Sequence, residues 1–237
     1  MSLTLSCSDL NSKADFKNSD QKKNSNTQNN TAEADLNADE KQPDLKQAAR
    51  LNAALGIGYL DQGDVVRAKE KLFKAIGFDK NSLEANTALA FFYERIKDYP
   101  EAEIYHKKSL KISKASQNYG GTYNNYGAYL CRQNRYSEAE AQFIKALEDK
   151  AYSGTSDVYE NYGLCAKLFK DYNKAERHLK TALDQNPSKY HIFMSLSDLY
   201  RLENKTDLAQ AYEQKYKELA LQAEHLNSEP EKNFDKN

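Results

Sequence analysis

The chain has 237 residues, with 34 basic and 35 acidic side chains and a formal net charge of -1, so it lacks the overall basic field that would attract nucleic acid. It contains no apolar run of about 18 residues, so we expect no membrane-spanning helix. Only four Pro and nine Gly interrupt it, which suits a mostly helical protein.

Residues 1–45 differ in composition from the rest of the chain. The stretch from Asn24 to Thr31 consists only of Asn, Ser, Thr and Gln. With nothing apolar to bury, it cannot offset the entropy that ordering would cost, so we expect a disordered polar tether over 1–45. Asp44 is the expected N-cap or first-turn acid of the first helix, directly ahead of Leu45.

Beyond the tether, a small residue is followed twelve positions later by an alanine, five times, at a period of roughly 34 residues. Two helices can approach closely only where both carry small side chains, so each pair predicts an antiparallel helical hairpin. The pairs are Gly56 with Ala68, Ala90 with Ala102, Gly127 with Ala139, Gly163 with Ala175, and Ser197 with Ala209. This period is typical of the tetratricopeptide repeat (TPR).

The repeats predict an all-α fold, a right-handed TPR superhelix (an α-α solenoid) of about five repeats plus a flanking helix, over residues 46–226. The expected repeats are 49–82, 83–116, 120–153, 156–189 and 190–223. The fifth repeat contains a charged helical stretch, 213–218, whose polar outer face suits a terminal cap. We expect residues 227–237 to be a disordered tail.

A solenoid of helix pairs usually binds a partner on its concave face. In TPR proteins this face is lined by set positions of each first helix, and here those positions form an apolar stripe with charged borders. Such a stripe suits an amphipathic helix or an apolar strand. The predicted groove residues are Ile57, Leu60, Phe91, Arg95, Asn124, Ala128, Arg132, Leu164, Leu168 and Leu202. The alternative is that some of them pack against the tether or a neighbouring helix.

Cysteines and histidines give no sign of a metal site, a cofactor or catalysis. Cys131 and Cys165 lie in predicted helices among apolar neighbours, form no CxxC motif, and are expected on different faces without a disulfide between them. His178 is expected to be a solvated surface residue. Since no HExxH, GxxxxGK[ST] or GxSxG motif occurs, we expect neither an enzyme nor a small-molecule substrate.

Three segments resemble one TPR family in particular. They are ALAFFYER at 88–95, the block from Asn124 to Ala139 with NNYGAYLC followed by RYSEA, and NYGLCA at 161–166. Together they resemble the type IV pilus biogenesis and stability lipoproteins PilW and PilF, over about residues 49–220.

The resemblance implies a pilotin, a lipoprotein on the periplasmic face of the outer membrane that promotes localisation, multimerisation or stability of the pilus secretin. The predicted groove would then bind the secretin. Cys7 is the candidate lipid-anchored residue, although Thr4-Leu5-Ser6-Cys7 is only a partial lipoprotein box and no hydrophobic segment precedes it.

Two other classes of function remain open. A soluble, cytoplasmic TPR scaffold or secretion chaperone would bind another protein partner, and a hydrophobic leader upstream would argue against it. In this alternative Cys7 is an ordinary free cysteine. A regulatory part of an enzyme would need a catalytic domain, and no segment of the chain is long enough to contain one.

Overall fold

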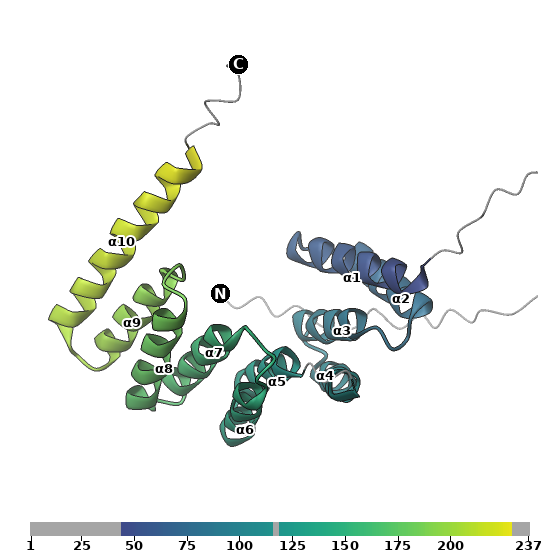
Figure 1. The fold of residues 1–237 in the computed structure, drawn as a ribbon, viewed down its shortest axis with the longest axis horizontal. Coiled ribbons are helices and arrows are strands. Elements are labelled where there is room, and N and C mark those ends of the chain that lie inside the picture. The colour runs from purple at the N-terminus through teal and green to yellow at the C-terminus, as the bar shows by residue number, and fades with distance from the viewer. Residues whose placement is uncertain (1–43, 116–118, 229–237) are drawn as a thin grey trace, which may run out of the picture. The chain divides into compact units, whose positions relative to one another are not determined.

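The structure, a computed structural model, describes residues 44–115 and 119–228, except the side chains of 224–228, all within one compact unit (Figure 1). The described residues form helices and no strands, which confirms the all-α prediction for this part of the chain. The helices are α1 (Leu45–Asp61), α2 (Val65–Phe78), α3 (Leu83–Arg95), α4 (Tyr99–Ala115), α5 (Gly120–Arg132), α6 (Tyr136–Glu148), α7 (Thr155–Leu168), α8 (Tyr172–Gln185), α9 (His191–Leu202) and α10 (Thr206–Ser228).

Consecutive helices pair into five hairpins, and each hairpin stacks on the one before it. Within a hairpin the first helix packs along the second, as α1 does on α2 and α7 on α8. The first helix of the next hairpin then packs against the preceding pair: α7, for example, contacts both α5 and α6. No helix among the described residues is both long and apolar enough to cross a bilayer.

The small-residue pairs lie where the two helices of a hairpin meet. A Cβ atom added at Gly127 would come within 2.8 Å of the Phe143 ring and 3.2 Å of the Ala139 carbonyl oxygen. In the last hairpin Ser197 takes the place of the glycine, and its hydroxyl donates to the Ala209 carbonyl oxygen at 2.7 Å. The predicted steric cause of the repeat is therefore present in the packing.

Every turn inside a hairpin contains one residue in the left-handed backbone region. It stands seven positions after the small residue, with φ between 58° and 79°. The next residue donates its N–H back across the turn, as Asp98 N does to the Tyr93 carbonyl oxygen at 2.9 Å, which ends the first helix. The left-handed residues are Gly63, Lys97, Asn134, Lys170 and Asn204.

Helices α1, α2, α3 and α8 begin at a residue whose side chain caps the first turn. Asp44 caps α1 by accepting hydrogen bonds from Lys46 N and Gln47 N, as expected from the sequence. The start of α5 is capped from a distance, because Asp149 accepts from the backbone N–H of Tyr119 and of Gly120. Residues 1–43, with most of the predicted tether and Cys7, lie outside the described residues, as do 229–237.

A disulfide joins Cys131 on α5 to Cys165 on α7, with their Cα atoms 5.8 Å apart. The prediction of no disulfide is therefore wrong. The prediction placed the two cysteines on different faces of their helices. In a first helix, however, the residue four positions after the small residue faces the next hairpin, and the residue two positions after it faces the preceding hairpin. Cys131 and Cys165 hold these two complementary positions, so stacking brings them together.

Candidate functional site

Five of the predicted groove residues lie together and line a pocket between α1, α3 and α5. This pocket, called the Arg132 pocket here, has a volume of about 500 Å³. Ile57, Leu60 and Phe91 supply its apolar surface, because they project from neighbouring first helices on the same side of the stack. Its lining residues are Ile57, Leu60, Asp61, Phe91, Glu94, Arg95, Tyr99, Arg132 and Gln133.

Glu94 fixes the charged wall of the Arg132 pocket. Its Oε2 accepts from Arg132 Nε at 3.0 Å and from the Arg132 terminal nitrogen Nη2 at 2.6 Å, which ties α3 to α5. Its Oε1 lies 2.8 Å from Nε2 of the fully buried His106 on α4. Burial alone would raise the pKa of Glu94, but the hydrogen bond to His106 and the charge of Arg132 outweigh it and lower the pKa.

The other charged lining residues are available to a partner. Within the described part of the chain, Arg95 and Asp61 make no ion pair and no side-chain hydrogen bond, and both are exposed. The Arg132 pocket thus offers an apolar floor, one guanidinium held by Glu94 and one unpaired guanidinium. This arrangement can hold an apolar side chain while polar groups of the same segment are bonded at the rim.

A second pocket shares a wall with the first. It has a volume of about 380 Å³ and includes Thr87, Ala88 and Asn125. Ile57 and Phe91 line both pockets, so these two side chains separate them. An extended or helical segment that lies over Ile57 and Phe91 can therefore reach both hollows.

The structure brings five of the ten predicted groove residues into the Arg132 pocket and leaves the other five outside both pockets described above. Asn124 is buried, and its Oδ1 accepts from Asn161 Nδ2 at 3.1 Å. Ala128 and Leu164 are half-buried against the cores of their own repeats, whereas Leu168 and Leu202 are exposed. The predicted stripe is thus concentrated at the first three repeats.

Sequence reasoning did not select several residues that shape the Arg132 pocket. Tyr99 begins a second helix, and Gln133 follows the end of α5, so neither falls on a first-helix groove position. His106, which lies on α4, contacts Glu94 through its ring nitrogen Nε2. A carboxylate that is largely buried needs hydrogen-bond or charge partners. Glu94 stands at a position that faces the next hairpin, so the sequence could have indicated that it needs partners such as His106 and Arg132.

His178 is not the solvated surface residue that was expected. Its ring stacks between those of Tyr159 and Tyr162, with centroids 5.6 and 4.2 Å away. It stands three positions after Ala175, and that position faces the first helix of the same hairpin. Tyr105 occupies the same position in the second repeat and stacks on Tyr93. An aromatic residue at this position of another repeat was therefore a sequence signal that the His178 ring packs against the first helix.

No group of three His, Cys, Asp or Glu side chains that could hold a metal ion occurs among the described residues. The Gly120 N–H at the start of α5 is bonded to Asp149 Oδ2 at 2.8 Å. The predicted lipidation residue, Cys7, lies outside the described residues.

The chain is similar to known proteins at the level of repeat, sequence and structure. A profile described as tetratricopeptide repeat matches residues 81–151 and 120–188. The type IV pilus assembly protein PilF of Pseudomonas aeruginosa is 32% identical over 158 residues, which cover 67% of this chain and 62% of PilF. An uncharacterized protein of Haemophilus influenzae is 32% identical over 119 residues, or 50% of this chain and 65% of that protein. The chain therefore spans less than two thirds of each of these curated relatives.

Two solved structures are similar over most of the described helices. The structure of Pseudomonas aeruginosa PilF has a TM-score of 0.63 and 30% identity, covering 73% of this chain and 77% of the PilF chain. The structure of PilW, a widely conserved type IV pilus biogenesis factor, has a TM-score of 0.66 and 27% identity, covering 73% of this chain and 78% of the PilW chain.

Proposed function

Because the chain belongs to the family of PilF- and PilW-like TPR proteins, we propose that it is a type IV pilus biogenesis factor that acts by binding another protein. We infer further that it is a pilotin whose partner is the pilus secretin, and that binding promotes the localisation, multimerisation or stability of the secretin. The proposal assigns it no catalytic role. The observation that carries it is the Arg132 pocket, an apolar hollow on a family scaffold.

The chemistry of the pocket supports a peptide segment as the ligand. Ile57 and Phe91 are half-buried, so they are held in place while part of each ring or chain stays accessible. Tight binding usually comes from a few such apolar anchors surrounded by polar groups. Arg95 and Arg132 supply these polar groups at the rim. We therefore place the secretin segment across Ile57 and Phe91.

The disulfide supports a periplasmic location for the proposed function. Disulfides persist in oxidising compartments such as the periplasm and are rare in the cytosol. A buried Cys131–Cys165 bond thus favours the pilotin over the alternative, a soluble scaffold or secretion chaperone in the cytoplasm.

We further propose that Cys7 carries a lipid that anchors the protein to the periplasmic face of the outer membrane. Intact mass spectrometry of the protein isolated from membranes of its host should find an acylated cysteine at position 7. An unmodified Cys7 in that sample would contradict the lipid anchor. It would not affect the groove proposal, which has a separate test.

Substitution of both Ile57 and Phe91 by Asp tests the groove. Two charges across the apolar floor should weaken secretin binding about 800-fold, at roughly 2 kcal/mol for each of the two anchors lost. Binding is measured with purified secretin, and circular dichroism checks that helicity is kept.

The matched control is Asp at Val66 and Phe73, which are exposed apolar residues on the outer face of α2. This variant should bind the secretin like the unmodified protein. Equal binding by the Ile57 and Phe91 variant would show that the Arg132 pocket is not the secretin site.

A further inference from the structure

The outer face of α1 has the pattern of a stacking surface. Leu51 and Leu55 stand five and one positions before Gly56, and in the four later first helices the residues at these positions are at most 7% exposed. Leu51 and Leu55 are instead 58% and 52% exposed. The buried equivalents are Ala85, Thr122, Val158 and Ile192 for Leu51, and Leu89, Tyr126, Tyr162 and Leu196 for Leu55.

In the later repeats, these positions contact the preceding hairpin. Tyr126 on α5 donates its hydroxyl to Glu103 on α4 at 3.0 Å. Tyr162 on α7 bonds to Glu140 on α6, and its ring stacks on Phe143 of the same helix with centroids 5.2 Å apart. Leu51 and Leu55 therefore lie on the face of α1 that, in the later first helices, packs against the preceding hairpin.

Gly58 leaves the backbone of this face without a side chain. It stands two positions after Gly56, where the later first helices carry Phe92, Tyr129, Cys165 and Leu199, all at most 2% exposed. A Cβ atom at Gly58 would meet no atom within 4 Å. The α1 face (Leu51, Ala54, Leu55 and Gly58) thus combines two exposed leucines with an open space and carries no charge.

The other end of the stack is built differently. Eight positions after the alanine, the first four second helices carry an apolar residue packed on a core cluster, whereas α10 carries Lys217, which pairs with Glu213 at 2.7 Å. The apolar equivalents are Ile76, Leu110, Leu147 and Leu183. Figure 1 shows α2 and α3 beside α1, and no further described helix packs on it.

We propose that the α1 face is a docking site for an amphipathic helix of another protein, which stacks on α1 as the second helix of a preceding repeat would. The α1 face continues the hairpin-to-hairpin interface of this chain, and that continuity defines its occupant. The docking helix presents apolar residues at positions i, i+3 or i+4, and i+7, without charge at the centre.

A second copy of this chain fits the α1 face poorly. Head-to-tail stacking would bury the Lys217–Glu213 pair of α10 against Leu51 and Leu55, and burying charged groups without new partners is costly. We therefore assign the α1 face to an amphipathic helix of a different protein rather than to a head-to-tail copy of this chain.

Site-specific photo-crosslinking in cells of the native host tests the proposal with the full chain. A benzoylphenylalanine replaces Leu55, and the crosslinked peptide is identified by mass spectrometry. The expected product joins position 55 to an amphipathic helix of another protein. The change Leu51→Asp should abolish this product, and it should leave the melting temperature of the purified protein unchanged because Leu51 is exposed.

Val66→Asp is the matched control, since Val66 is 81% exposed on α2 and does not belong to the α1 face. It should leave the crosslink from position 55 intact. Crosslinks that map to this chain itself, no crosslink at position 55, or equal loss with Val66→Asp would each overturn the proposal. Because none of these outcomes depends on Ile57 or Phe91, the result is distinct from the test of the secretin groove.

Discussion

Individual carboxylates and tyrosines link successive repeats. Glu103, Glu140 and Glu176 each stand one position after the repeat alanine, and each is hydrogen-bonded to a tyrosine hydroxyl of the next first helix. Burial would raise the pKa of Glu103, but bonds from Lys107, Arg135 and Tyr126 lower it to about 2. The carboxylate therefore stays ionised and keeps its contacts throughout the neutral and mildly acidic range.

His178 should make the stability of the protein depend on pH. Its burial between two tyrosines, aided by the charges of Arg177 and Lys174, lowers its pKa from 6.5 to about 4. The unfolded chain then takes up a proton near pH 6.5 that the folded chain accepts only near pH 4. Stability is thus full above pH 6.5 and falls by about 1–3 kcal/mol as pH drops toward 4.

Urea denaturation at pH 7.5 and pH 4.5 measures this loss. His178→Phe keeps a ring between Tyr159 and Tyr162 but removes the titrating group, so its unfolding free energy should fall less between the two pH values. The same fall in both proteins would assign the acid sensitivity to other groups.

At the scale of helices, the disulfide is a covalent link between two repeats. It closes a segment of 34 residues between α5 and α7. Closing a loop of this length lowers the entropy of the unfolded chain, so replacement of Cys131 and Cys165 by Ala should cost about 3–4 kcal/mol of unfolding free energy. Chemical denaturation of the oxidised protein and of the double variant compares the two.

Reduced, unmodified protein serves as the control and should unfold like the double alanine variant. If oxidised and reduced protein had the same midpoint, the bond would have to be absent from the folded molecule in solution.

The pairing of helices within a hairpin could be predicted from the repeat spacing, but that spacing alone did not predict the Cys131–Cys165 contact between hairpins. The spacing of small residues predicts that Gly127 lies against α6, because α5 and α6 can approach closely only where the side chain is as small as that of glycine. The Cys131–Cys165 contact depends instead on the angle at which α5 and α7 stack, and the repeat period does not encode that angle. The same limit explains why the predicted stripe did not separate Phe91, which lines the Arg132 pocket, from Leu168, which lines neither pocket.

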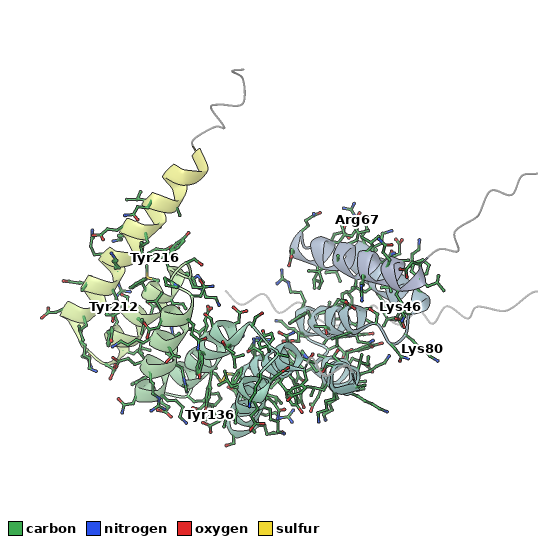
Figure 2. The ribbon with its side chains drawn as sticks, in the orientation of Figure 1. Lys46, Arg67, Lys80, Tyr136, Tyr212 and Tyr216 are labelled. Atoms are coloured by element: carbon green, nitrogen blue, oxygen red, sulfur yellow. A yellow bond between two sulfur atoms is a disulfide. The ribbon has the colours of Figure 1, made fainter. Side chains whose placement is uncertain are left out.

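On the scale of the whole helical unit, the two ends of the stack are chemically unlike. The last helix is fastened to its hairpin by aromatic contacts: Tyr212 and Tyr216 project from α10 toward α9 (Figure 2), where Tyr212 meets Tyr200 with ring centroids 5.1 Å apart. The charged stretch 213–218 exposes Gln214, Lys215, Lys217 and Glu218, as the sequence predicted for a terminal cap, whereas Leu221 further along α10 is an exposed apolar residue. Among the described residues, no helix caps α1 on the side of the N-terminus, and this difference follows from particular residues rather than from the repeat.

The disulfide also determines how the unit would respond to tension along the chain. Residues 132–164 lie inside a covalent loop, so a pull on the two ends cannot draw them out, and about 110–120 Å of contour length stays hidden. Arg132 stands at the first position inside the loop, so its backbone remains anchored to α7 even when the repeats before it unravel. A load would therefore open the Arg132 pocket from the side of α1 and α3, and α5 would be left as the fixed wall.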